Sequence, residues 1–120
     1  MVKTYRKGAN AERDLAKKLK SLGFSVIRAA RSGGTISTPD LVAIKDKSVL
    51  AFECKAWKTK PILRKDELKE FKEWCEKSGA IGILAWKKRG RWLFLRVEEI
   101  KDKNIIKDGI NIEQLTNEMV

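Results

Sequence analysis

The chain has 120 residues, of which 42% are hydrophobic and 36% are charged, a balance that favours one folded domain over residues 1–120 and excludes a disordered chain. Lysine and arginine number 27 against 16 acidic residues, so the net charge is +11 and a polyanionic partner is expected, most plausibly nucleic acid. A membrane surface is disfavoured because we find no long apolar run, no signal peptide and no basic amphipathic helix with a bulky apolar face. We therefore expect an intracellular, cytoplasmic protein.

Histidine is absent, and the two cysteines, Cys54 and Cys75, fall in different predicted elements without a C-x-x-C spacing. Zinc and a disulfide framework are both disfavoured, and two buried thiols are expected instead. The lack of imidazole also excludes every mechanism that pairs serine or cysteine with histidine. Any catalysis must then use carboxylates, lysine, a hydroxyl group or a metal ion.

The first predicted helix begins at Tyr5 or Gly8 and ends at Leu22, before Gly23. Its apolar stripe has helical spacing: Ala11, Leu15, Leu19 and Leu22. Glu12 lies on the edge of this stripe. One interpretation makes it a first-turn acid favoured by the helix dipole, and the other makes it a functional carboxylate turned toward the core. Its orientation favours the second.

A short strand is predicted from Phe24 to Arg28, followed by a loop from Ser32 to Pro39 that contains two adjacent glycines. Glycine permits close approach of the backbone to a ligand, and the loop leads directly into Asp40, so Ser32 can be brought to a phosphate group. The cations that we expect to contact a polyanion are Lys3, Arg6, Lys7, Arg13, Arg28, Arg31, Lys58, Lys60 and Lys87.

Two runs rich in β-branched and aliphatic residues, 38–44 and 49–55, predict an antiparallel hairpin. Asp40 opens its first strand, while Glu53 and Lys55 are two positions apart and share one face of the second. Two carboxylates and a lysine near one point suit a hard cation such as Mg²⁺ or Mn²⁺, which would polarise a phosphoryl oxygen and activate water for phosphodiester hydrolysis. An ion pair on the solvated face of an ordinary hairpin is an equally compatible interpretation.

A second helix is predicted from Arg64 to Lys77. Its Phe71 and Trp74 are larger than a short helix needs to cover one sheet, so part of this face could pack against a second copy of the chain. Core packing within the chain is the favoured alternative for either aromatic taken singly. A nearly continuous apolar strand, 81–86, and a further strand, 92–97, follow and flank a basic turn.

The order helix, strand, strand, strand, helix, strand, strand predicts an α/β fold with a central mixed sheet flanked by helices. Four sequence features then carry a family resemblance: Arg6-Lys7-Gly8-x-x-Ala11-Glu12-Arg13, the loop residue Ser32, Pro39-Asp40 and Glu53-x-Lys55. In this order and spacing they resemble the PD-(D/E)XK nuclease superfamily and, more closely, the archaeal-type Holliday junction resolvases. The resemblance implies a restriction-endonuclease-like core.

The resemblance also implies a homodimeric, magnesium-dependent endonuclease, with Mn²⁺ as a substitute ion, that nicks opposing strands of a four-way DNA junction in the nucleoid. The residues that it marks as catalytic are Glu12, Ser32, Asp40, Glu53 and Lys55. Within this set, Asp40 and Glu53 would be direct metal ligands and Glu12 a further acidic residue of the metal site. Arg13 and Arg28 would contact DNA or support the site, and Phe71 falls on the dimerisation helix.

Two alternatives stay open. Another nuclease of the same superfamily would act on duplex, flap or damaged DNA. A non-catalytic junction-binding protein would be expected to have lost Asp40, Glu53 or Lys55, and all three residues are present.

Overall fold

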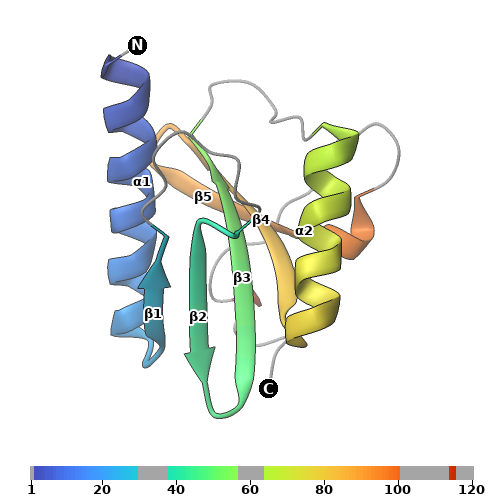
Figure 1. Ribbon diagram of the computed structural model, residues 1–120. Helices are drawn as coiled ribbons and strands as arrows, with labels where there is room; N and C mark the ends of the chain where they lie inside the picture. The colour runs from blue at the N-terminus through green and yellow to red at the C-terminus, as the bar shows by residue number, and fades with distance from the viewer. Residues whose placement is uncertain (1, 30–37, 57–63, 101–113, 116–120) are drawn as a thin grey trace.

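The computed structural model describes residues 2–29, 38–56, 64–100 and 114–115 (Figure 1). Its elements are α1 (Val2–Ser21), β1 (Ser25–Arg28), β2 (Leu41–Lys45), β3 (Ser48–Lys55), α2 (Lys65–Ser78), β4 (Ile81–Lys88), β5 (Arg91–Arg96) and the 3-10 helix η1 (Val97–Glu99). The predicted order of helices and strands is confirmed. The first helix begins earlier than predicted, at Val2. No helix in these described ranges is long and apolar enough to cross a membrane.

The five strands form one mixed sheet in the order β1-β2-β3-β4-β5. Neighbouring strands are antiparallel except β3 and β4, which run parallel. A parallel pair needs a crossover connection, and α2 lies within the one that joins β3 to β4. In Figure 1 the two helices flank the sheet, α1 beside β1 and α2 beside β4.

The core is divided into two clusters by the alternation of side chains along the strands. On the α1 side, Leu15 and Leu19 pack with Phe52 and other strand residues, while Ala51 faces the α2 side with Phe71. Strand β4 contributes to both clusters, as its continuous apolar run predicted: Ile83 and Ala85 on the α1 side, Leu84 and Trp86 on the α2 side. Glu53 and Lys55 alternate with Phe52 and therefore point to the α2 side.

The end of α1 differs from the prediction. Leu22 lies beyond the last helical residue, Ser21, and its side chain is exposed, so its assignment to the buried stripe was wrong. Gly23 then adopts a positive φ of 95°, which reverses the chain direction. Phe24 is buried after this turn and takes the place in the core that the helical spacing assigned to Leu22.

The turn between β2 and β3 fixes the register of the hairpin. Asp46 and Lys47 both have positive φ, 48° and 71°, as in the two-residue turns whose twist matches that of antiparallel strands. The resulting register pairs Leu41 with Phe52. Asp40, the residue before β2, is thereby placed close to the end of β3, where Glu53 and Lys55 lie.

Candidate active site at one end of the sheet

Three strands bring the predicted residues to the same end of the sheet. Strand β1 ends at Arg28, β2 begins at Leu41 and β3 ends at Lys55. Because β2 is antiparallel to both neighbours, Arg28 pairs with Leu41 and Leu41 pairs with Phe52. The end of β1, the start of β2 and the end of β3 therefore meet at this edge.

Asp40 is held between the two neighbouring strands. Its backbone N–H donates to the carbonyl oxygen of Phe52 at 2.9 Å, although Phe52 is also the strand partner of Leu41. The regular ladder between β2 and β3 ends here, since Asp40 precedes the first residue of β2. On the other side, the carbonyl oxygen of Asp40 accepts a hydrogen bond from the Ala29 N–H at 3.0 Å.

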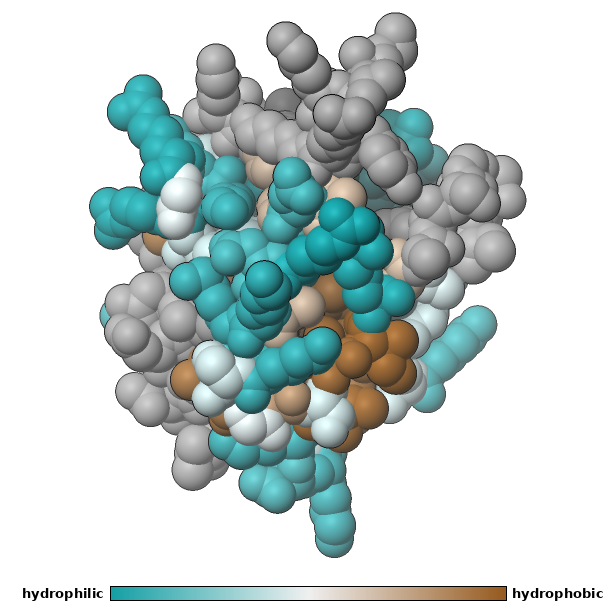
Figure 2. All heavy atoms as spheres, turned by 90° about the vertical axis from the view of Figure 1, so that its left-hand side faces the viewer, coloured by the Kyte–Doolittle hydropathy of each residue, from teal (hydrophilic) through white to brown (hydrophobic). Residues whose placement is uncertain are grey.

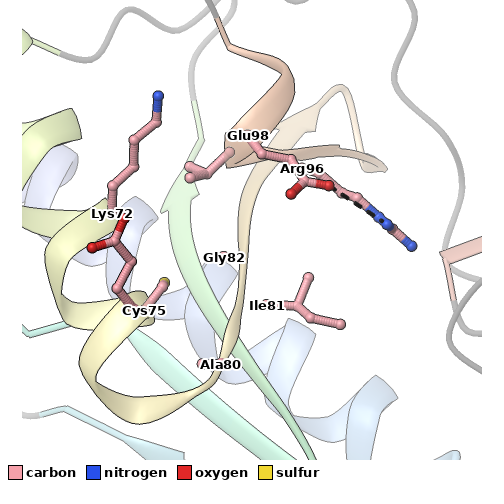
Figure 3. Close-up of a pocket in the computed structure, with 9 residues that line it drawn as sticks. Lys72, Cys75, Ala80, Ile81, Gly82, Arg96 and Glu98 are labelled. Carbon is pink, nitrogen blue, oxygen red and sulfur yellow. Dashed lines mark ion pairs between the residues drawn. The ribbon is translucent and has the colours of Figure 1, made fainter.

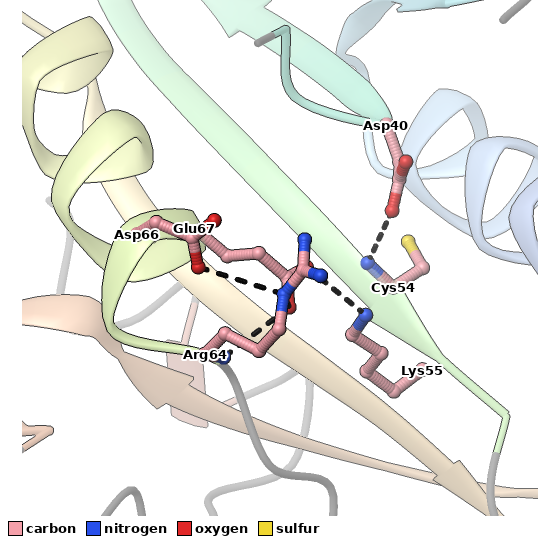
Figure 4. A network of polar contacts seen from close by, with 6 residues as sticks. All are labelled: Asp40, Cys54, Lys55, Arg64, Asp66 and Glu67. Carbon is pink, nitrogen blue, oxygen red and sulfur yellow. Dashed lines mark hydrogen bonds and ion pairs between the residues drawn. The ribbon is translucent and has the colours of Figure 1, made fainter. Parts of the chain in front are cut away.

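The carboxylate of Asp40 is also fixed. Its Oδ2 accepts a hydrogen bond from the backbone N–H of Cys54 at 2.7 Å (Figure 4), and the residue is only 6% exposed. A side-chain oxygen thus satisfies a strand N–H that would otherwise need a backbone acceptor. Because Asp40 contacts both Phe52 and Cys54, it lies opposite the residue between them, Glu53.

Glu53 points to the α2 side of the sheet, where its negative charge affects the pKa of a buried thiol, that of Cys75. Burial raises the pKa of the Cys75 thiol to about 11, and the negative charge of Glu53 adds to this rise because it disfavours a second negative charge nearby. Cys75 lies on α2, so this electrostatic effect agrees with the orientation expected from strand alternation. Cys75 is buried as predicted, whereas Cys54 is only half-buried, and both are free thiols.

Lys55 lies two residues beyond Glu53, and its ammonium is directed to the start of α2. Its Nζ lies 3.8 Å from Oε2 of Glu67, and the Lys55 side chain is 17% exposed. In Figure 4, Asp40 reaches the backbone of β3 at Cys54, whereas the Lys55 side chain extends from β3 with its ammonium on the side of Arg64 and Glu67. The sequence motif did not include Glu67, which is separated from Lys55 by the segment 57–63, outside the described residues.

Glu12 reaches the same end of the sheet from α1. Its Oε1 forms an ion pair with Nε of Arg28 at 3.0 Å, and both side chains are mostly buried. Because α1 begins at Val2 and has no acid in its first turn, the helix-dipole interpretation of Glu12 was wrong. Arg28 adjoins Ala29, which bonds to the Asp40 carbonyl, so the Glu12–Arg28 pair lies beside Asp40 along the sheet edge.

The described residues contain no group of three or more cysteine, aspartate or glutamate side chains placed to hold a metal ion. The site offers Asp40, at the start of β2, and Glu53, on the paired strand β3, with Glu12 engaged by Arg28. Magnesium retains several water ligands and is commonly bound through one or two carboxylates together with substrate phosphates. An oxygen-only donor set of this size fits such an ion.

Comparisons with known proteins agree with this geometry. Residues 3–119 match the family model described as archaeal Holliday junction resolvase (Hjc). The chain belongs to this family. It is 40% identical to the crossover junction endodeoxyribonuclease Hjc of Methanocaldococcus jannaschii over 76% of this chain and 66% of the relative, just under two thirds of its length. Identity to the Hjc of Sulfolobus acidocaldarius is 32%, over 91% of this chain and 85% of that protein.

A solved structure of Archaeoglobus fulgidus Hjc, described as a Holliday junction resolvase from an archaeal hyperthermophile, is also similar. Its TM-score with this chain is 0.78 at 32% identity, with 90% of this chain and 98% of that chain covered. The predicted restriction-endonuclease-like α/β fold and the predicted family resemblance are both confirmed.

Lys87 is one of the predicted DNA-binding residues of this Holliday junction resolvase family member. Its ammonium forms an ion pair with Asp14 of α1. Its Nζ lies 3.3 Å from Oδ2 of Asp14 and 5.7 Å from the ring centre of Trp92. The same Oδ2 accepts a hydrogen bond from Trp92 Nε1–H at 3.1 Å, and this bond, with the positive charge of Lys87, lowers the pKa of Asp14. Asp14 was not among the predicted residues, because nothing in its local pattern separates it from a solubilising acid.

The outward face of α1 is strongly basic in this resolvase family member. Figure 2 shows mostly hydrophilic side chains over the α1 side of the molecule, with an apolar area at its lower right. The exposed cations on the described part of this helix are Arg13, Lys17, Lys18 and Lys20. Arg13 was predicted to contact DNA, and its Nη1 donates to Asn10 Oδ1 at 3.4 Å.

Several predicted site residues fall outside what the structure describes. Ser32, Arg31, Lys58 and Lys60 lie in the undescribed segments, and the side chains of Lys3, Arg6 and Lys7 are not described either. Their roles stay predictions.

The two aromatic residues predicted at a dimer interface differ in their surroundings. Phe71 is 6% exposed and belongs to the α2-side core, which is the alternative favoured for it from sequence. Trp74 is half-buried and packs against the edge of that core. Trp74 therefore retains more surface for a partner than Phe71.

A hollow beside α2 lies away from this site. It is lined by Lys72, Cys75, Glu76, Ala80, Ile81, Gly82, Arg96, Val97 and Glu98 (Figure 3). Ile81 begins β4 and pairs with Leu50, whereas Lys55 pairs with Trp86 near the far end of β4. The hollow thus lies at the other end of the β3–β4 pair from Lys55, although Glu53 is near enough for its charge to raise the pKa of Cys75 in the hollow's lining.

Proposed function

We propose that this chain is a structure-specific endonuclease that resolves four-way DNA junctions by metal-dependent nicking of opposing strands. The observation that carries this proposal is the placement of Asp40 opposite Glu53, with Lys55 two residues farther along the same strand, in a member of the Holliday junction resolvase family. Relatives named crossover junction endodeoxyribonuclease support the reaction class.

The proposed metal is Mg²⁺, with Mn²⁺ as a substitute. Asp40 and Glu53 would hold it, and Glu12 would complete the acidic surroundings. Oxygen donors suit these hard cations, whereas zinc sites usually use cysteine and histidine. When bound, the ion supplies polarisation of the phosphoryl oxygen and a more acidic water.

The chain's own residues contribute orientation and charge. The Cys54 N–H fixes one oxygen of the Asp40 carboxylate, so this group has a set orientation before any ligand arrives. The ammonium of Lys55 would offset negative charge that develops on the phosphate during hydrolysis. Arg28 would compensate the charge of Glu12, with which it is paired. We further propose that Ser32 brings a hydroxyl to the scissile phosphate, as the family resemblance implies.

The proposed assembly is a homodimer, because a two-fold pair of sites matches the approximate symmetry of a four-way junction and explains paired nicks. Each copy carries a net charge of +11, so binding would weaken steeply as the salt concentration rises. Phosphate contacts are proposed for the predicted cations. The dimer contact is proposed for α2 through Trp74, since Phe71 is buried in the core of its own chain. We also propose that residues 1–120 act as one nuclease domain in the nucleoid.

Cleavage of a synthetic four-way junction, with each strand labelled separately, tests this function. Reactions in Mg²⁺ and in EDTA are compared with those on a plain duplex of the same sequence. Paired, symmetric nicks on the junction alone, dependent on metal, are expected. Equal cleavage of the duplex would instead indicate a general nuclease, and tight junction binding without nicks would indicate a binding protein.

A further inference from the structure

Glu67 lies where the start of α2 meets the end of β3. Its Oε2 is 3.8 Å from the ammonium of Lys55, and its Oε1 accepts a hydrogen bond from the backbone N–H of Arg64 at 3.2 Å. The guanidinium Nε of Arg64 also lies 3.3 Å from Oε1. Figure 4 shows the carboxylate between the two cations, with Arg64 on one side and Lys55 on the other.

We propose that Glu67 is a positioning residue for Lys55, holding its ammonium on the α2 side of β3 so that it faces the phosphate group at the reaction centre. This inference rests on the proposed function, in which Lys55 is the catalytic lysine. Glu67 acts through Lys55 and has no assigned contact with substrate.

The restraint on the carboxylate distinguishes this pair from an ordinary surface ion pair. Two exposed side chains lose conformational entropy when they pair, so such pairs contribute little. Here Arg64 already holds Oε1, which leaves Oε2 directed to Lys55, and the two side chains are only 31% and 17% exposed. A long lysine side chain has many rotamers, and a fixed carboxylate selects the few that bring Nζ to this point.

Asp66 provides a matched control. It precedes Glu67 in the first turn of α2 and also pairs with Arg64, at 3.5 Å, but it is 68% exposed. The variant Asp66→Asn removes the same charge from the same helical turn. The variant Glu67→Gln keeps an amide oxygen that can accept the Arg64 N–H, so the helix start is preserved while the charge facing Lys55 is lost.

The first test measures the reactivity of Lys55 directly and does not require cleavage. A lysine-acylating reagent is added in limiting amount to the 120-residue protein, and the labelled lysines are quantified by peptide mass spectrometry. An ammonium held against a carboxylate reacts slowly, because it must leave its partner before it can meet the reagent. We expect Glu67→Gln to raise the labelling of Lys55 several-fold and Asp66→Asn to leave it unchanged. Unchanged labelling in Glu67→Gln would overturn the proposal.

The second test uses single-turnover cleavage of the junction. Glu67→Gln is expected to lower the rate about tenfold with junction affinity and melting temperature unchanged, as is common for residues that orient a functional group. In a Lys55→Met background the same substitution should have no further effect, because the group it orients is gone. An equal loss in both backgrounds would contradict the proposal.

The two proposals can fail separately. If the unmodified protein does not nick the junction but Glu67→Gln still raises Lys55 labelling, the nuclease function fails and the positioning role stands. If the protein nicks the junction normally but labelling does not respond, only the positioning role fails.

Discussion

The carboxylate of Asp40 accepts the backbone N–H of Cys54 at 2.7 Å, and this bond joins a candidate metal ligand to the strand that carries the other. Glu53 is the residue before Cys54. A shift of β2 against β3 would therefore break this bond and change the position of Asp40 relative to Glu53. The same bond satisfies a strand N–H at the point where the regular pairing of β2 and β3 ends. The geometry of the site and the hydrogen bonding of the sheet end depend on one side chain.

Neutralising Asp40 should abolish cleavage without unfolding the protein. In Asp40→Asn an amide oxygen can still accept the Cys54 N–H, so the sheet end is preserved while the negative charge is lost. We expect no metal-dependent nicks and junction affinity equal to or tighter than that of the unmodified protein, since less negative charge faces the DNA. Cleavage and gel-shift assays on the same preparation measure both, and full cleavage by Asp40→Asn would rule out its role as a ligand.

Asp14→Asn should lower stability at neutral pH but not in strong acid. The Trp92 N–H and Lys87 lower the pKa of Asp14 below its ordinary value of 3.8, so its stabilising effect is complete above that value and is lost as the pH falls through the lowered pKa. Because the side chain is 41% exposed, the effect should be small, under about 1 kcal/mol. Urea unfolding of both proteins across this pH range measures it. A difference that grows in acid would contradict the assigned cause.

Gly82→Ala should destabilise the α2 side of the core. A Cβ at this position would lie 2.8 Å from Sγ of Cys75 and 3.3 Å from Cγ1 of Val97, so side chains or backbone must shift. Overpacking of this kind typically costs about 1–3 kcal/mol. The double variant Gly82→Ala with Cys75→Ala should lose less than the sum of the two single losses, because the sulfur that causes the contact is gone. Additive losses, measured by urea unfolding, would show that Cys75 is not the cause.

Phe71 and Trp74 should respond differently to truncation. Phe71 is buried within the chain, so Phe71→Ala should lower the free energy of unfolding by about 3–5 kcal/mol. Trp74→Ser should have a smaller effect on unfolding of the monomer but should weaken the proposed homodimer, because more of its surface is available to a partner. Sedimentation over a range of protein concentrations measures the dimer. A Trp74→Ser protein that dimerises as tightly as the unmodified chain would remove Trp74 from the interface.

The local patterns in the sequence determined much of the fold. Alternation placed Glu53 and Lys55 on one face of β3, and the continuous apolar run 81–86 predicted a strand buried on both faces, as β4 is. These features follow from backbone geometry, in which side chains repeat every two residues in a strand and every 3.6 in a helix. Leu22 fitted the helical repeat but not the core, because the helix had already ended.

The partners of the site residues were decided by tertiary structure. Glu12 pairs with Arg28, Lys55 with Glu67, and Asp14 with Trp92, and each pair joins different elements. No local period relates such residues, since their approach depends on how α1 and α2 pack against the sheet and on the register set by the turns. The sequence therefore supplied the candidate chemical groups, and the packing of helices on the sheet determined which charges meet.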